Sequence, residues 1–72
     1  MKAKTSWTDV RILNGKLKLP LDFTLKKVGI KPYVVEKYMS GEIEPKHPTC
    51  EKIHEYLCSV RSKRAEFYNT IA

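Results

Sequence analysis

The chain has 72 residues, of which 42% are hydrophobic and 31% are charged. That length suffices for one small domain with little core to spare, and it excludes most enzyme architectures, which need a pocket on top of a core. Fourteen Lys and Arg residues against eight Asp and Glu residues give a net charge of +6, which favours polyanionic partners. We therefore expect a single domain over residues 1–72 without enzymatic activity.

The sequence predicts a cytoplasmic protein. No apolar run approaches the roughly 18 residues that a membrane-spanning helix needs. Residues 1–6 are polar and lead into no apolar stretch, so they do not read as a signal peptide. Two cysteines are too few for a disulfide scaffold, and we expect both thiols to be reduced.

Two interpretations stay open for residues 10–19. In the first, Ser6 and Asp9 form a capping box and open a helix that ends at Gly15. One face of that helix carries Trp7, Val10 and Leu13. In the second, apolar residues alternate around a tight turn and form a β-hairpin. Those residues are Val10, Ile12, Leu17 and Leu19, with Asn14-Gly15 as the turn.

Two short helices are predicted next, over residues 21–28 and 32–40. Gly29 follows the first helix and is expected in a left-handed conformation. Pro32 suits the first turn of the second helix, and Gly41 ends it. The predicted core includes Trp7, Phe23, Val35 and Tyr38. The outer side of the second helix is predicted to carry Tyr33, Glu36, Lys37 and Ser40.

The last predicted segment begins near Thr49, which is a suitable N-cap. It is either one long helix or two helices joined at residues 59–62. Its apolar residues are Ile53, Leu57, Val60, Phe67 and Ile71. Residues 60–72 are a candidate dimerisation tail, in which the expected dimer contacts are Phe67, Tyr68 and Ile71. The basic cluster of Arg61, Lys63 and Arg64 is either a solvated face or an extra phosphate patch.

Four side chains in this region, His47, Cys50, His54 and Cys58, raise the question of a zinc site. Cys50 and Cys58 would lie about 12 Å apart along a helix, too far for ligands that bind zinc at about 2.3 Å. No phosphate-binding glycine loop, nucleophile elbow or pair of carboxylates in a pocket accompanies them. The sequence therefore predicts no metal, no cofactor and no catalytic residue.

Residues 24–41, TLKKVGIKPYVVEKYMSG, resemble the helix-turn-helix of phage repressors, Cro proteins and their bacterial relatives, the XRE-like group. Gly29 stands in the turn, and Val35 and Tyr38 anchor the second helix six and nine residues later. Residues 48–57, PTCEKIHEYL, resemble the helix that packs behind this unit. The resemblance covers about residues 6–58. It implies an all-α domain of four to five helices, and it favours the helix over the hairpin for the first segment.

Four positions depart from the family pattern. Leu21 stands where the family often has a phosphate-binding Gln, and Leu25 stands where a small residue usually packs at the helix crossing. Lys31 replaces the usual Ser or Thr cap of the second helix. Pro32 occupies a position that often carries a base-reading Gln, and its side chain has no donor. These departures affect the identity of the contacts more than the fold.

The resemblance implies a transcriptional regulator, from a phage or another mobile element, that binds operator DNA as a homodimer in the cytoplasm or on the nucleoid. Residues 32–40 would be its recognition helix, and no cofactor would be needed. The implied base contacts are Tyr33, Glu36 and Lys37. The implied phosphate contacts are Lys31, Ser40, Lys46, Lys26 and Lys27.

Two other functions stay open. The same fold can serve as a protein-interaction module, such as a small antirepressor or an inhibitor of a DNA-binding protein. It can also bind nucleic acid through charge alone, which predicts salt-dependent affinity without sequence preference.

Overall fold

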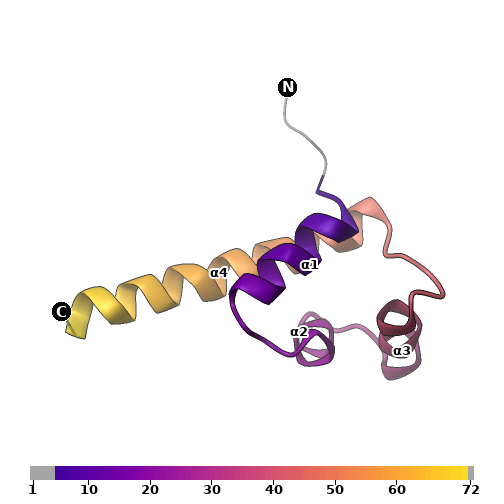
Figure 1. Cartoon of the computed structure of the whole chain (residues 1–72), viewed down its shortest axis with the longest axis horizontal. Helices are drawn as coiled ribbons and strands as arrows, with labels where there is room; N and C mark the ends of the chain where they lie inside the picture. Colours follow the sequence, from indigo (N-terminus) through magenta and orange to yellow (C-terminus); the bar gives the residue numbers. More distant parts are fainter. Residues whose placement is uncertain (1–4, 72) are drawn as a thin grey trace.

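The computed structural model describes the backbone of residues 5–71 and the side chains of residues 5–65. Over that range the chain forms four helices and no strand (Figure 1). They are α1 (Trp7–Lys16), α2 (Leu21–Lys27), α3 (Pro32–Ser40) and α4 (His47–Ile71). The all-α class is therefore confirmed, and residues 10–19 do not form a hairpin.

Helix α1 begins at the predicted capping box. The Asp9 N–H donates to Ser6 Oγ at 3.1 Å, and the Ser6 N–H donates to the Asp9 carboxylate at 3.2 Å. The predicted end at Gly15 is wrong, because the helix continues to Lys16. Glycine tolerates helical geometry, and the chain turns only where Leu17 becomes buried and Lys18 adopts a φ of 57°.

Helices α2 and α3 are joined by a short turn that depends on glycine. Gly29 has a φ of 92°, which side-chain-bearing residues rarely adopt. The turn is closed by the Ile30 N–H, which donates to the Leu25 carbonyl at 3.1 Å. Pro32 is the first residue of α3, and Gly41, with a φ of 81°, caps its end. Both predicted boundaries of α3 are confirmed.

The core lies where α1, α2 and α4 meet. Its buried hydrophobic residues are Trp7, Val10, Leu17, Leu25, Val35, Cys50, Ile53 and Leu57. Tyr38 is half-buried against them, with its ring centroid 5.9 Å from that of Trp7. The prediction of Phe23 as a core residue is wrong, since 44% of it is exposed. The short helix α2 buries Thr24 and Leu25 instead.

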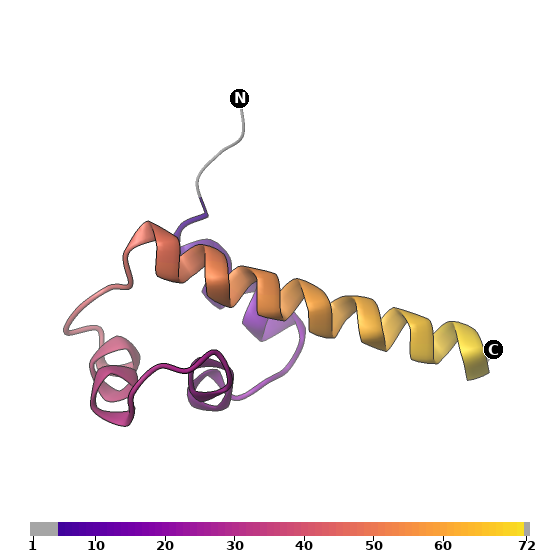
Figure 2. The same cartoon turned by 180° about the vertical axis from the view of Figure 1, so that it is seen from behind.

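Helix α4 is one uninterrupted helix, so the predicted alternative of a break at residues 59–62 does not occur. It begins at His47, two residues before the predicted start at Thr49, because the Cys50 N–H already donates to the Lys46 carbonyl at 3.0 Å. Its C-terminal part runs beyond the other three helices (Figures 1 and 2). Among the described residues, none of the helices has the length and apolar character needed to cross a membrane.

A buried polar pair joins α1 to α2. Thr24 Oγ1 donates to Asn14 Oδ1 at 2.6 Å, and Asn14 Nδ2 donates to the Leu19 carbonyl at 2.9 Å. Thr24 is fully buried and Asn14 is 5% exposed. The oxygen and the nitrogen of the Asn14 side-chain amide both have hydrogen-bond partners. The pair therefore holds the α1–α2 connection without leaving a buried polar atom unpaired.

Replacing Thr24 by Val should destabilise the protein by about 1–3 kcal/mol, because the change keeps the shape but leaves Asn14 Oδ1 buried without a donor. Urea unfolding measures the difference. Thr8→Val is the matched control, since Thr8 is exposed on α1 and its replacement should change stability by less than about 0.5 kcal/mol. Equal stability of Thr24→Val and the parent would show that the pair is dispensable.

Candidate nucleic-acid interface

The outer side of α3 carries four polar or aromatic side chains in one stripe. Tyr33, Glu36, Lys37 and Ser40 are spaced by three, one and three residues, which places them on one face of a helix. All four are exposed, and Tyr33 reaches 60%. Val35, which is 3% exposed, faces the core instead. The three predicted base-contact residues are therefore accessible on one face.

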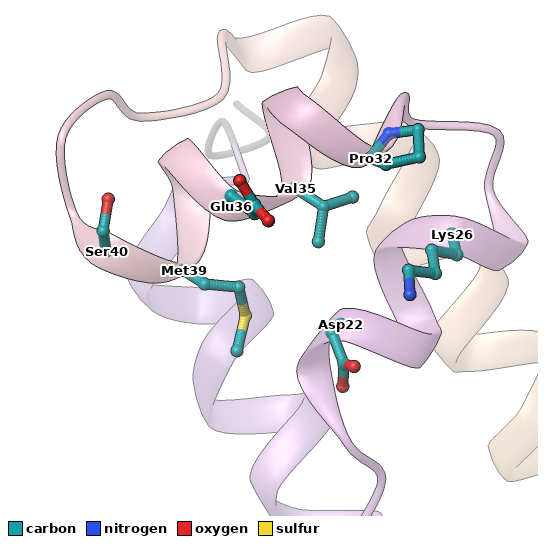
Figure 3. Close-up of a pocket in the computed structure, with 7 residues that line it drawn as sticks. All are labelled: Asp22, Lys26, Pro32, Val35, Glu36, Met39 and Ser40. Atoms are coloured by element: carbon teal, nitrogen blue, oxygen red, sulfur yellow. The ribbon is translucent and has the colours of Figure 1, made fainter.

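A groove separates α2 from α3 beside this stripe (Figure 3). Seven residues line it: Asp22, Lys26, Pro32, Val35, Glu36, Met39 and Ser40. Its wall on α3 is largely apolar, while Asp22 and Lys26 project from α2 on the opposite side (Figure 3). Three of the predicted contact residues meet at this groove, namely Lys26, Glu36 and Ser40. The other five, which do not line it, are Tyr33, Lys37, Lys27, Lys31 and Lys46.

The charges at the groove are available to a ligand. Among the described side chains, the one contact within 4.0 Å between a basic and an acidic group joins His47 Nε2 to Glu51 Oε1 in the first turn of α4. Asp22, Lys26 and Glu36 therefore have no charged partner within that distance in the described part of the chain. A groove with two carboxylates and one ammonium can accept as well as donate hydrogen bonds.

Sequence reasoning missed the parts that Asp22 and Met39 play in this groove. Asp22 precedes Lys26 by four residues, so helical spacing alone places the two side chains on one face of α2. No local pattern shows that this face meets Met39 on α3, because the meeting depends on the crossing of the two helices.

Lysines surround α3 on several elements. Lys26 and Lys27 lie on α2, Lys31 immediately precedes α3, and Lys46 precedes α4, and all four are exposed. Lys27 Nζ lies 5.4 Å from the centroid of the Phe23 ring, which tethers its ammonium to the surface of α2. These lysines add to Lys37, which belongs to the stripe, and three carboxylates, Asp22, Glu42 and Glu44, lie in the same part of the sequence.

The Ser40 hydroxyl is already engaged in ending α3. Ser40 Oγ donates to the Lys37 carbonyl at 3.1 Å and accepts from the Glu42 N–H at 3.4 Å. A phosphate oxygen is an acceptor, so a phosphate contact from Ser40 requires the bond to Lys37 to break. Ser40 is consequently the least suited of the five predicted phosphate contacts.

The thiols and imidazoles of α4 do not gather at one point. Burial raises the pKa of the Cys50 thiol, and the Glu44 carboxylate adds to the rise. Cys58 Sγ lies 3.6 Å from His54 Nδ1, a contact between neighbouring turns of one helix. Among the described residues, no group of three His, Cys, Asp or Glu side chains is placed to hold a metal ion.

The predicted dimer contacts, Phe67, Tyr68 and Ile71, lie outside the side chains that the structure describes. The comparisons with known proteins add no assignment: no protein-family model, curated protein or solved structure matches the chain. The functional assignment therefore rests on the exposed stripe of α3 and on the lysines around it.

Proposed function

We propose that this chain is a sequence-specific DNA-binding transcriptional regulator that inserts α3 into the major groove of an operator. The observation that supports this best is the exposed stripe of Tyr33, Glu36 and Lys37 on a short helix whose opposite side is anchored by Val35. The major groove is about 12 Å wide and admits one α-helix. A helix presented in this way reads base edges with a few side chains.

The three side chains have complementary chemistry for base edges. The Lys37 ammonium donates to O6 and N7 of guanine, and the Glu36 carboxylate accepts from N4 of cytosine. Tyr33 contacts a thymine methyl group or donates to a phosphate. Pro32 offers no donor and contributes at most an apolar contact with a thymine methyl group.

The surrounding lysines serve a different purpose. Lys26, Lys27, Lys31 and Lys46 bind phosphates, which set the position of the protein on the duplex without reading its sequence. We further propose that two copies bind together, with half-sites about 34 Å apart along the DNA. By occupying a promoter, the protein then regulates transcription without any cofactor. We propose that it acts in the cytoplasm and originates from a phage or another mobile element.

Selection from a random duplex library at about 150 mM salt tests the proposal, since nonspecific binding is weak under that condition. We expect a short motif that is repeated as an inverted pair about one helical turn apart. A folded protein that selects no motif would contradict sequence-specific binding, and the protein-interaction module would then become the leading alternative.

A further inference from the structure

The net charge of the chain is concentrated in two stretches. Residues 10–21 and 56–65 contain no Asp or Glu, and together they carry six of the fourteen basic residues. Those residues are Arg11, Lys16, Lys18, Arg61, Lys63 and Arg64. The other eight basic residues are balanced by the eight acidic ones, so the whole charge of +6 belongs to these two stretches.

The fold brings the two stretches together. Arg64 Nη1 on α4 donates to the Leu17 carbonyl at 2.6 Å, although 47 residues separate the two in sequence. Lys16 and Lys18 flank Leu17 in the sequence. Arg61 precedes Arg64 by three residues, so the two lie side by side on one face of α4. We call Lys16, Lys18, Arg61 and Arg64 the loop–helix patch. All four are exposed, and none has a carboxylate within 4.0 Å among the described side chains.

The backbone at Lys18 provides a second observation. Its φ of 57° is in the left-handed region, at the position after a helix where glycine or asparagine is usual. A lysine adopts this conformation at a cost that glycine avoids. Because Lys18 is exposed, burial of its side chain does not offset that cost. The local structure therefore gives no reason for lysine at this position, and its ammonium group is free to contact a ligand.

The surface has the character of a phosphate-binding site rather than of a protein or membrane contact. Of the large exposed hydrophobic residues of the described part of the chain, Phe23, Tyr33, Met39 and Ile43 lie on other elements, while Ile12 lies one turn before Lys16 on α1. Protein hot spots combine arginine with tryptophan and tyrosine, and membrane-binding helices insert aromatic or aliphatic side chains. The four residues of this patch include no aromatic or aliphatic side chain. A phosphodiester backbone needs only a row of exposed cations.

We infer that the loop–helix patch is a second DNA-binding surface, which contacts the phosphodiester backbone outside the base pairs that α3 reads. This inference rests on the proposed function. Arg61 lies 14 residues after the start of α4 at His47, or about 20 Å along the helix axis. In Figure 1, α3 lies on the side of the molecule where α4 begins. Arg61 and Arg64 are in the second half of α4. A distance of about 20 Å along α4 corresponds to about six base pairs of duplex DNA.

The test compares the salt dependence of DNA binding for the parent and the Lys18→Gly/Arg61→Ala variant. On a 30-base-pair duplex, the slope of log K against log salt should fall by about 0.9 for each phosphate contact that is lost. Lys18→Gly alone should keep or raise the thermal midpoint, because glycine relieves the left-handed backbone. Lys52→Ala is the matched control, since Lys52 is an exposed lysine on α4 outside the patch and its loss should leave the slope unchanged.

The outcomes separate this inference from the proposed function. A folded double variant with the parent's slope would overturn the patch, whatever the sequence preference. A parent that binds DNA without sequence preference would overturn the proposed function, while the slopes would still decide on the patch.

On a duplex that carries the selected motif, removing about six flanking base pairs should lower the parent's slope to that of the variant. If the slope of log K against log salt were the same with and without the flanking base pairs, the patch would not contact DNA beside the motif.

Discussion

The Tyr33→Ala/Lys37→Ala double variant is expected to fold like the parent and to lose its preference for the selected motif by at least about tenfold. Both side chains are exposed on α3, so their removal does not open the core. Each good contact with a base edge contributes about 1–3 kcal/mol of discrimination, which sets the scale of the loss. Affinity for DNA of any sequence should persist, because the surrounding lysines remain.

Competition between duplexes with the motif and with a scrambled sequence measures this preference, and circular dichroism checks that the variant is folded. Lys46→Ala is the control that separates phosphate contact from base reading. It should weaken binding to both duplexes by the same factor, because a phosphate contact carries no sequence information. A double variant that keeps the parent's preference would show that α3 is not the element that reads the bases.

Leu25→Ala is expected to cause the largest loss of stability, about 2–5 kcal/mol. Leu25 is fully buried, and its backbone carbonyl also closes the turn between α2 and α3. Removing its side chain leaves a cavity beneath α2, next to the turn into α3. A domain of 72 residues has a total stability of only about 4–11 kcal/mol, so a substantial share of the variant should be unfolded at room temperature or after mild heating.

Urea unfolding of Leu25→Ala and Ile12→Ala tests this expectation. Ile12 is 53% exposed on α1, so truncating it should change stability far less than truncating Leu25. The comparison also bears on the resemblance to repressors, in which a small residue is usual at the position of Leu25. If Leu25→Ala were as stable as the parent, the neighbouring helices would have to close around the smaller side chain.

Local signals predicted most helix boundaries correctly. The capping box of Ser6 and Asp9, the N-terminal proline Pro32 and the terminating glycine Gly41 all act within four or five residues of the chain. Gly15 was misleading because glycine permits a helix to end without requiring it. The burial of Leu17 decides where α1 ends, and that burial depends on α4 and the rest of the core.

Helical spacing also predicted the exposed stripe of α3, because the direction of a side chain around a helix is set by its residue number along the chain. The same reasoning failed for Phe23, which is apolar but lies on the outer side of α2. A helix of seven residues can bury only a narrow face, and Thr24 and Leu25 occupy it. The hydrophobicity of the side chains alone did not show that Phe23 is exposed while its neighbours Thr24 and Leu25 are buried.

The sequence by itself determined the charge of the chain and the residues that face outward on α3, but it left residues 10–19 open between a helix and a hairpin. Only the tertiary structure decided which distant residues meet: Asn14 with Thr24, Arg64 with the Leu17 carbonyl, and Asp22 with Met39 across a groove. Caps and helical spacing depend on neighbours within one or two turns of the chain. Contacts between helices depend on crossing angles that are set when all the core side chains pack together, and no local pattern encodes those angles.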